Sequence, residues 1–189
     1  MTSDEQLLEI FNMRASIRSF TGEQVSDEAI DKIISCAIKA PSSGNMQPWE
    51  FVVIKSKAKK SEIVKTTFTG YFASGSNHQS WLLDAGFLMV VGANTKRTKA
   101  RYGDLGEYWP IIDTAAAIEN SLLAASALGL GSCWIGGYDE EKIKDIVKFP
   151  SYIKPIGVIA IGHTTASAER QNRLPIELVK HDECYGEKI

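Results

Sequence analysis

Cysteine and histidine are scarce in this chain of 189 residues, and positive charge is not in surplus. The 21 lysine and arginine residues are outnumbered by 23 acidic residues, which gives a formal net charge of -2. Phosphate backbones attract basic proteins, so nucleic acid is not expected as a partner. Cys36, Cys133 and Cys184 lie far apart without a CxxC pair, a pattern that fits neither a disulfide framework nor a zinc site.

Long apolar runs are missing as well. No stretch reaches the roughly 18 apolar residues of a transmembrane helix. The first residues include Asp4 and Glu5 but no apolar core of a signal or transit peptide. We therefore expect a cytoplasmic protein with no membrane contact. His78, His163 and His181 lie in separate segments without a paired metal ligand, so we expect them at the surface and predict no metal site and no hydrolytic triad.

Apolar residues recur at two different spacings, which predicts helices around a few buried strands. Helical spacing runs through Ile30, Ile33 and Ile34, behind the N-cap candidate Ser26. Helices are predicted over residues 4–11, 26–38 and 111–128 and after Asp139, and buried strands over 49–54, 87–92 and 156–161. Residues 1–189 are thus expected to form a single α+β domain.

Arg14, Ser16 and Arg18 occupy alternate positions in the segment that follows the first predicted helix. An extended chain points alternate side chains to one side, so these three would face one ligand together. Two guanidinium groups and a hydroxyl suit the oxygens of a terminal phosphate. Short arginine motifs are also common in solvated basic turns, and taken alone this motif favours the turn.

The segment PSSGNMQPW, residues 41–49, joins a predicted helix to a predicted strand and collects small hydroxyls and amides. Asn45 and Gln47 carry both donors and acceptors, which match the alternating donors and acceptors on a flavin's pyrimidine edge. The same side chains could instead bond their own backbone in a capped connection. Both interpretations fit the sequence equally well.

The glycine-rich segment GLGSCWIGGY, residues 129–138, matches two nucleotide-binding motifs in part and neither in full. A dinucleotide fingerprint requires glycine at Trp134 and a preceding strand, but this segment follows a predicted helix. A phosphate loop requires lysine and a hydroxyl residue where Gly137 and Tyr138 stand. We predict instead that Gly136 and Gly137, which lack a Cβ, let the main chain approach a flat ligand, and that Trp134 belongs to the core.

Together, RASIRSF, APSSGNMQPWEFVVI and LGLGSCWIGG, with RQNRLPIELVKHDECYG near the end, resemble the nitroreductase family of FMN enzymes over nearly the whole chain. The resemblance implies a mixed sheet flanked by helices in a domain-swapped homodimer, with helix 111–128 in the interface and FMN sites between the subunits. One subunit would contribute Arg14, Ser16, Arg18 and Arg173, and the other Pro41, Ser42, Ser43, Asn45 and Gln47, while Gly136 and Gly137 would face the flavin's N5 atom.

The same resemblance implies a ping-pong reaction, in which NAD(P)H reduces the flavin and a nitroaromatic, a quinone or a similar small acceptor then collects the electrons. The flavin carries this chemistry, so no residue is expected as acid, base or nucleophile. A specialised flavin reaction, such as reductive dehalogenation or ring dehydrogenation, is one alternative, and a non-catalytic flavin-binding or sensor domain is another. The family also uses a mid-chain polar residue near the flavin, and Asn77 and Gln79 are candidates without a matching motif.

Two connections rich in aromatic residues, 68–81 and 102–109, are expected to wall the substrate cleft. We favour the second connection, because charged neighbours make Tyr102 and Tyr108 poor candidates for a core. Trp109 at its end is included in this prediction.

Overall fold

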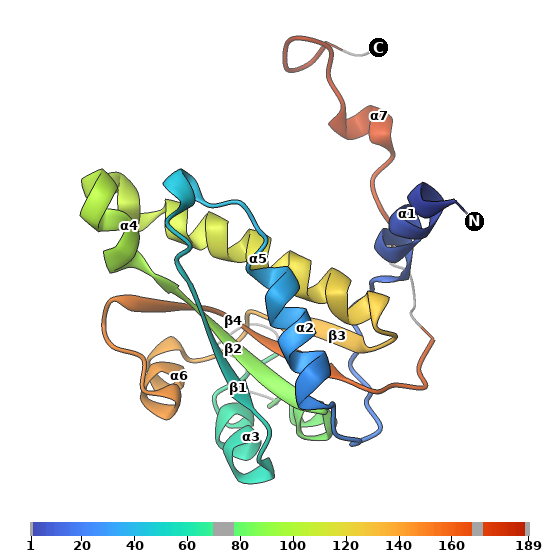
Figure 1. Ribbon diagram of the computed structural model, residues 1–189, viewed down its shortest axis with the longest axis vertical. Coiled ribbons are helices and arrows are strands. Elements are labelled where there is room, and N and C mark those ends of the chain that lie inside the picture. The colour runs from blue at the N-terminus through green and yellow to red at the C-terminus, as the bar shows by residue number, and fades with distance from the viewer. Residues whose placement is uncertain (1, 70–77, 168–171, 188–189) are drawn as a thin grey trace.

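The computed structural model describes residues 2–69, 78–167 and 172–187. Its centre is a four-stranded sheet in the order β1-β2-β4-β3, in which neighbouring strands run antiparallel (Figure 1). The strands are β1 (Trp49–Ile54), β2 (Phe87–Asn94), β3 (Gly131–Ile135) and β4 (Ile153–Gly162). The predicted strands are confirmed, and the two with the longest apolar runs, β2 and β4, occupy the middle of the sheet.

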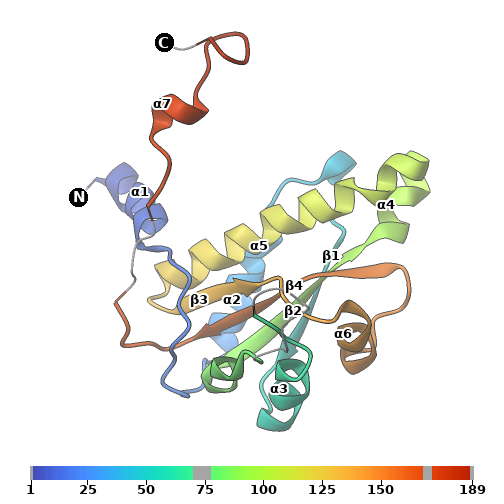
Figure 2. The same cartoon turned by 180° about the vertical axis from the view of Figure 1, so that it is seen from behind.

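Helices cover both faces of the sheet (Figures 1 and 2). The helices α2 (Asp27–Ala37) and α5 (Trp109–Ala127) lie on one face, and α3 (Lys57–Val64) and α6 (Glu140–Val147) lie on the other. Alternate residues of a strand face opposite sides, so β2 contributes to both layers of the core. Met89 packs in the cluster that includes Ile33 of α2, and its neighbour Leu88 in the cluster that includes Ile63 of α3.

Side-chain caps mark the start of three of the four predicted helices. Ser26 caps α2 and Asp139 caps α6, as predicted, and Thr2 forms a capping box at the start of α1 (Ser3–Met13). The helix α5 begins two residues before its predicted start and ends where Gly129 takes a left-handed φ of 72°. The α+β class is therefore confirmed.

Two helices and one strand beside the sheet core have no counterpart among the predicted elements. The helices α3 and α4 (Thr95–Tyr102) read KAKKSEIV and TKRTKARY, and such polar segments carry little apolar periodicity. The strand β3 is only five residues long and starts at Gly131, directly after the turn that ends α5. Trp134 of β3 was wrongly expected in the core: it is 37% exposed, because it lies on the opposite face of the strand from its buried neighbours Cys133 and Ile135.

The connections contain further helical turns. Single 3-10 turns occur at η1 (Ser43–Asn45), η3 (Ser80–Asp84) and η4 (Gly103–Glu107), and the C-terminal tail holds the short helix α7 (Ile176–Val179). This α7 stands apart from both helix layers (Figure 2). The connection 102–109 is therefore not an open loop, since the end of α4, all of η4 and the start of α5 fall within it.

Candidate flavin site

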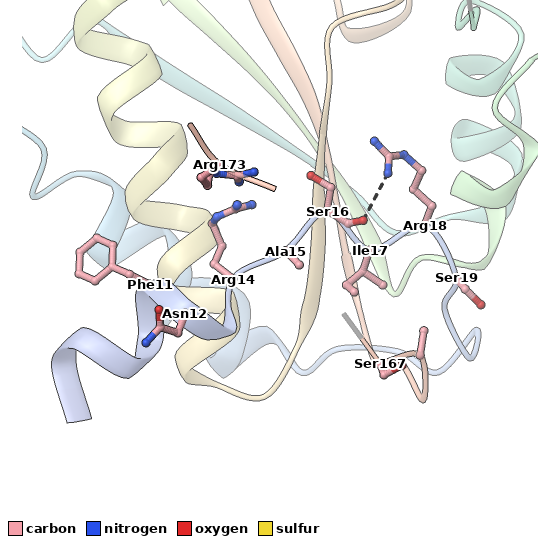
Figure 3. Close-up of a pocket in the computed structure, with 11 residues that line it drawn as sticks. Phe11, Asn12, Arg14, Ala15, Ser16, Ile17, Arg18, Ser19, Ser167 and Arg173 are labelled. Atoms are coloured by element: carbon pink, nitrogen blue, oxygen red, sulfur yellow. Dashed lines mark hydrogen bonds between the residues drawn. The ribbon is translucent and has the colours of Figure 1, made fainter. Parts of the chain in front are cut away.

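The segment that follows α1 runs along the free edge of β3. Ser16 forms a parallel bridge to Ser132, and the Ile17 amide donates to the Ser132 carbonyl at 2.9 Å. Ile17 is buried in the core, whereas Arg14, Ser16 and Arg18 extend to the opposite side of the segment (Figure 3). The alternation read from the sequence thus places the three polar side chains on one side.

These three residues line a pocket of about 580 Å³, which Arg173 reaches from the C-terminal tail (Figure 3). Three guanidinium groups from opposite ends of the chain therefore share one pocket. Their combined charge makes the pocket strongly positive, and the Ser16 hydroxyl adds a neutral donor. Guanidinium forks bind phosphate oxygens in pairs, so the donor set fits a terminal phosphate group such as that of FMN.

Acceptors within the protein already contact two of these guanidinium groups. The Nε atom of Arg14 lies 3.7 Å from Oε1 of Glu119 on α5, and Nη1 of Arg18 donates to the Ser16 carbonyl at 3.4 Å. The Glu119 side chain is about half exposed, so water screens the ion pair. A screened ion pair and a long hydrogen bond leave donors of Arg14 and Arg18 for an anion.

The loop 41–47 lies outside this pocket, close to the start of α5. The Ser43 amide and hydroxyl both donate to the buried Asp113 carboxylate, at 2.9 and 3.2 Å. No residue of this loop lines the arginine pocket of its own chain. The structure therefore brings together Arg14, Ser16, Arg18 and Arg173, and it keeps apart from them Pro41, Ser42, Ser43, Asn45 and Gln47.

Hydrogen bonds inside the loop include those of a capped connection. The Ser42 hydroxyl accepts from the Gln47 amide at 2.9 Å, and the Gln47 side chain donates to the Asn45 carbonyl at 3.4 Å. Asn45 and Gln47 are nevertheless exposed. The capped connection is therefore present in the structure, and it leaves Asn45 and Gln47 accessible to a ligand.

Gly136 and Gly137 follow β3 and lie beside the end of the segment 66–69. The Phe68 amide donates to the Gly137 carbonyl at 2.9 Å, and a Cβ on Gly137 would lie 2.6 Å from the Phe68 carbonyl oxygen. A Cβ on Gly136 would meet open space. Gln79 is buried and donates to the Phe68 carbonyl at 3.2 Å, so it supports this junction, while Asn77 lies outside the described residues.

Aromatic residues of the connection 102–109 differ in their surroundings. The Tyr102 and Trp109 rings meet edge to face with centroids 5.0 Å apart, whereas Tyr108 is 65% exposed. Tyr108 borders a separate hollow of about 490 Å³ between α4, α5 and α6. Of the other connection, residues 70–77 lie outside the described part of the chain.

The histidines are less exposed than expected. His78 is at the surface, with Nδ1 2.8 Å from the Thr67 carbonyl, but His163 and His181 are each partly buried. Among the residues that the structure covers, no cluster of three potential ligands could hold a metal ion. In that same part of the chain, no helix combines the length and apolar character needed to span a membrane.

Comparison with known proteins places the chain in a family. The model of the nitroreductase family matches residues 12–163. A protein of Archaeoglobus fulgidus, provisionally named NADH dehydrogenase/NAD(P)H nitroreductase, is 34% identical over 84% of this chain and 86% of its own. FMN reductase (NAD(P)H) of Bacillus subtilis is 29% identical over 90% of this chain and 70% of its own.

The fold agrees with the sequence comparison. The structure of NfrA2 from Bacillus megaterium is 27% identical and superposes with a TM-score of 0.83, covering 96% of this chain and 75% of its own. The chain therefore belongs to the nitroreductase family, as its motifs indicated.

Proposed function

We propose that this protein is an FMN-dependent oxidoreductase that takes a hydride from NAD(P)H and passes electrons to a small acceptor, such as a nitroaromatic compound or a quinone. The observation that carries the proposal is the pocket shared by Arg14, Arg18 and Arg173, whose charge suits a phosphate. Relatives named FMN reductase and NAD(P)H nitroreductase support it. FMN, when bound, would supply the redox chemistry, so no side chain is assigned as acid, base or nucleophile.

The arginine pocket is assigned to the FMN phosphate. Arg14, Arg18 and Arg173 would bind its oxygens, with the Ser16 hydroxyl as a further donor. The pocket volume of about 580 Å³ falls within the ~300–1,000 Å³ usual for small-ligand sites.

The flavin ring is assigned to the glycine pair and to the loop 41–47. Gly136 leaves the ring face open to close approach, since a Cβ there would meet nothing within 4 Å. Pro41, Ser42, Ser43, Asn45 and Gln47 would contact the flavin from the partner subunit, because they lie apart from the arginine pocket of their own chain.

A homodimer follows from this division of the site. Large apolar side chains, which normally avoid water in such numbers, are exposed on α1 (Leu7, Leu8, Phe11) and on α7 (Ile176, Leu178, Val179). We propose that the second subunit covers them. We also propose that residues 1–189 form one domain, since a single sheet carries the two larger core clusters.

The cofactor assignment is tested by the colour of the purified protein. A yellow preparation whose released chromophore is FMN, bleached rapidly by NADH or NADPH without oxygen, is the expected result. Protein that binds no FMN when reconstituted would refute the assignment. FMN that stays oxidised with both coenzymes would instead identify a flavin-binding or sensor domain.

The shared site is tested by sedimentation at several protein concentrations, with and without FMN. Flavin content and dimer content should rise together, because a ligand that binds only the dimer stabilises it. A monomer that retains its full complement of FMN would contradict a site built from two subunits.

A further inference from the structure

The loop 41–47 has a backbone that the chain does not adopt readily. Gly44, Asn45 and Gln47 all have left-handed φ angles, of 55°, 57° and 48°. Glycine tolerates this region and asparagine also adopts it, but for a residue such as Gln47 it costs about 1–2 kcal/mol, and such a conformation persists only where the surrounding structure holds it.

Asp113 holds the first half of the loop from α5. Its Oδ2 atom accepts from the Ser43 amide at 2.9 Å and its Oδ1 atom from the Ser43 hydroxyl at 3.2 Å. The residue is 8% exposed. A buried carboxylate that accepts two hydrogen bonds is a strong anchor, since bonds to charged groups are stronger than neutral ones.

The helix α4 holds the other side of the loop. The Arg97 guanidinium donates to the Gln47 carbonyl and also to Glu50 Oε1, the latter at 2.7 Å. Arg101 donates to the Gly44 carbonyl at 3.2 Å. Tyr102 closes over Gly44, where a Cβ would collide with its hydroxyl.

We propose that Asp113 and Arg97 are positioning residues that hold the loop 41–47 in its left-handed conformation before FMN arrives. The inference rests on the proposed function, because it assigns the loop to the flavin. A loop that is already ordered loses less conformational entropy when the ligand binds, which strengthens binding. Asp113 and Arg97 act through Ser43 and Gln47 and need no contact with the flavin themselves.

Asp113→Ala tests the α5 anchor in the apoprotein and in the complex. Hydrogen exchange of the Ser43 amide should accelerate, and the Kd for FMN should rise about tenfold or more, because two bonds to a carboxylate are lost. Asp113→Asn should restore both in large part, since the amide oxygen accepts from the Ser43 amide and the Ser43 hydroxyl can turn to accept from the amide nitrogen, but these bonds lack the charge of the carboxylate.

Arg97→Ala tests the α4 anchor against a matched control, Lys99→Ala. Both variants remove one cation from the same helix, but Lys99 pairs with Glu107 and makes no bond to the loop. Arg97→Ala should raise the Kd for FMN and speed exchange of the amides in 43–47, whereas Lys99→Ala should leave both at the wild-type value. An equal effect of the two variants would overturn the positioning role.

The outcomes separate the inference from the proposed function. Wild-type protein that binds FMN, together with Asp113→Ala and Arg97→Ala variants that bind it equally tightly, would overturn the inference alone. Wild-type protein that binds no FMN would overturn both. Arg97 lies at the surface, so its variant keeps the test decisive even where Asp113→Ala does not fold.

Discussion

The arginine pocket and the loop 41–47 prepare for a ligand in opposite ways. In the pocket, Arg14 meets one half-exposed carboxylate and Arg18 one backbone carbonyl at 3.4 Å, so charge is left for the ligand to satisfy. In the loop, backbone carbonyls and the Ser43 donors are already bonded to Asp113 and to α4. The pocket is arranged to supply charge and the loop to supply shape.

This difference predicts that salt and backbone geometry affect the two contributions to FMN affinity differently. Affinity that comes from the pocket should fall as salt rises, because ions screen exposed charges, with a Debye length of ~10 Å at 0.1 M and ~3 Å at 1 M. Affinity that comes from the loop should depend on backbone geometry and hardly on salt. Variants of the two regions can therefore be told apart by how the FMN affinity responds to ionic strength.

The largest effect is expected in the pocket. Arg14→Ala and Arg18→Ala should each weaken FMN binding by about 1.5–3 kcal/mol, since each removes a charge-assisted bond to phosphate. Both should also flatten the salt dependence of the Kd. Equilibrium dialysis measures these changes, with Lys32→Ala on α2 as the control for the loss of a distant cation. Unchanged affinity in both arginine variants would show that this pocket does not bind the FMN phosphate.

A smaller effect is expected where the loop meets α4. Gly44 and Gly129 both have left-handed φ angles, of 55° and 72°, but only a Cβ on Gly44 meets a neighbour, the Tyr102 side chain. Gly44→Ala should therefore lower the free energy of unfolding by about 1–3 kcal/mol more than Gly129→Ala, because overpacking against Tyr102 adds to the strain of a left-handed φ, which both variants share. Chemical denaturation measures the difference in the free energy of unfolding. Equal losses in the two variants would show that the Tyr102 side chain moves aside without cost.

A kinetic effect without a loss of stability is expected at Tyr108. Tyr102 and Trp109 pack together beside the loop, so Tyr108 remains the aromatic of this connection best placed to meet a substrate. Tyr108→Ala should change kcat/KM for nitroaromatic or quinone acceptors, while the free energy of unfolding changes by no more than about 0.5 kcal/mol. Steady-state kinetics with FMN content as the control would show whether Tyr108 belongs to the cleft.

The smallest effect is expected at Cys133, the buried thiol of β3 close to Arg18 and Ser16. Burial raises the pKa of the Cys133 thiol, and nearby Arg18 and Ser16 offset the increase only in part. The thiolate is the reactive form, so labelling of Cys133 should be slower than that of exposed Cys36 and Cys184, and FMN should slow it further. In a variant whose only thiol is Cys133, the labelling rate of that residue can be followed by itself. Labelling as fast as in unfolded protein would show that the segment 14–18 does not shield Cys133.

The sequence by itself determined the local features of this protein. Period-two alternation placed Arg14, Ser16 and Arg18 on one side, because a strand-like segment has only two sides. Cap residues such as Ser26 and Asp139 fixed where helices begin, because they bond amides within the same turn. The family motifs went further and associated Arg173 with Arg14, a pairing that no local pattern contains.

Only the tertiary structure decided what holds the loop 41–47. Neither Asp113, a carboxylate in an alanine-rich helix, nor Arg97, one of the cations of TKRTKARY, is singled out by the sequence. Asp113 lies 70 positions from Ser43, and Arg97 lies 50 positions from Gln47. Contacts at such separations exist only once the sheet has aligned α4 and α5 beside the loop, and no local spacing of residues encodes that alignment.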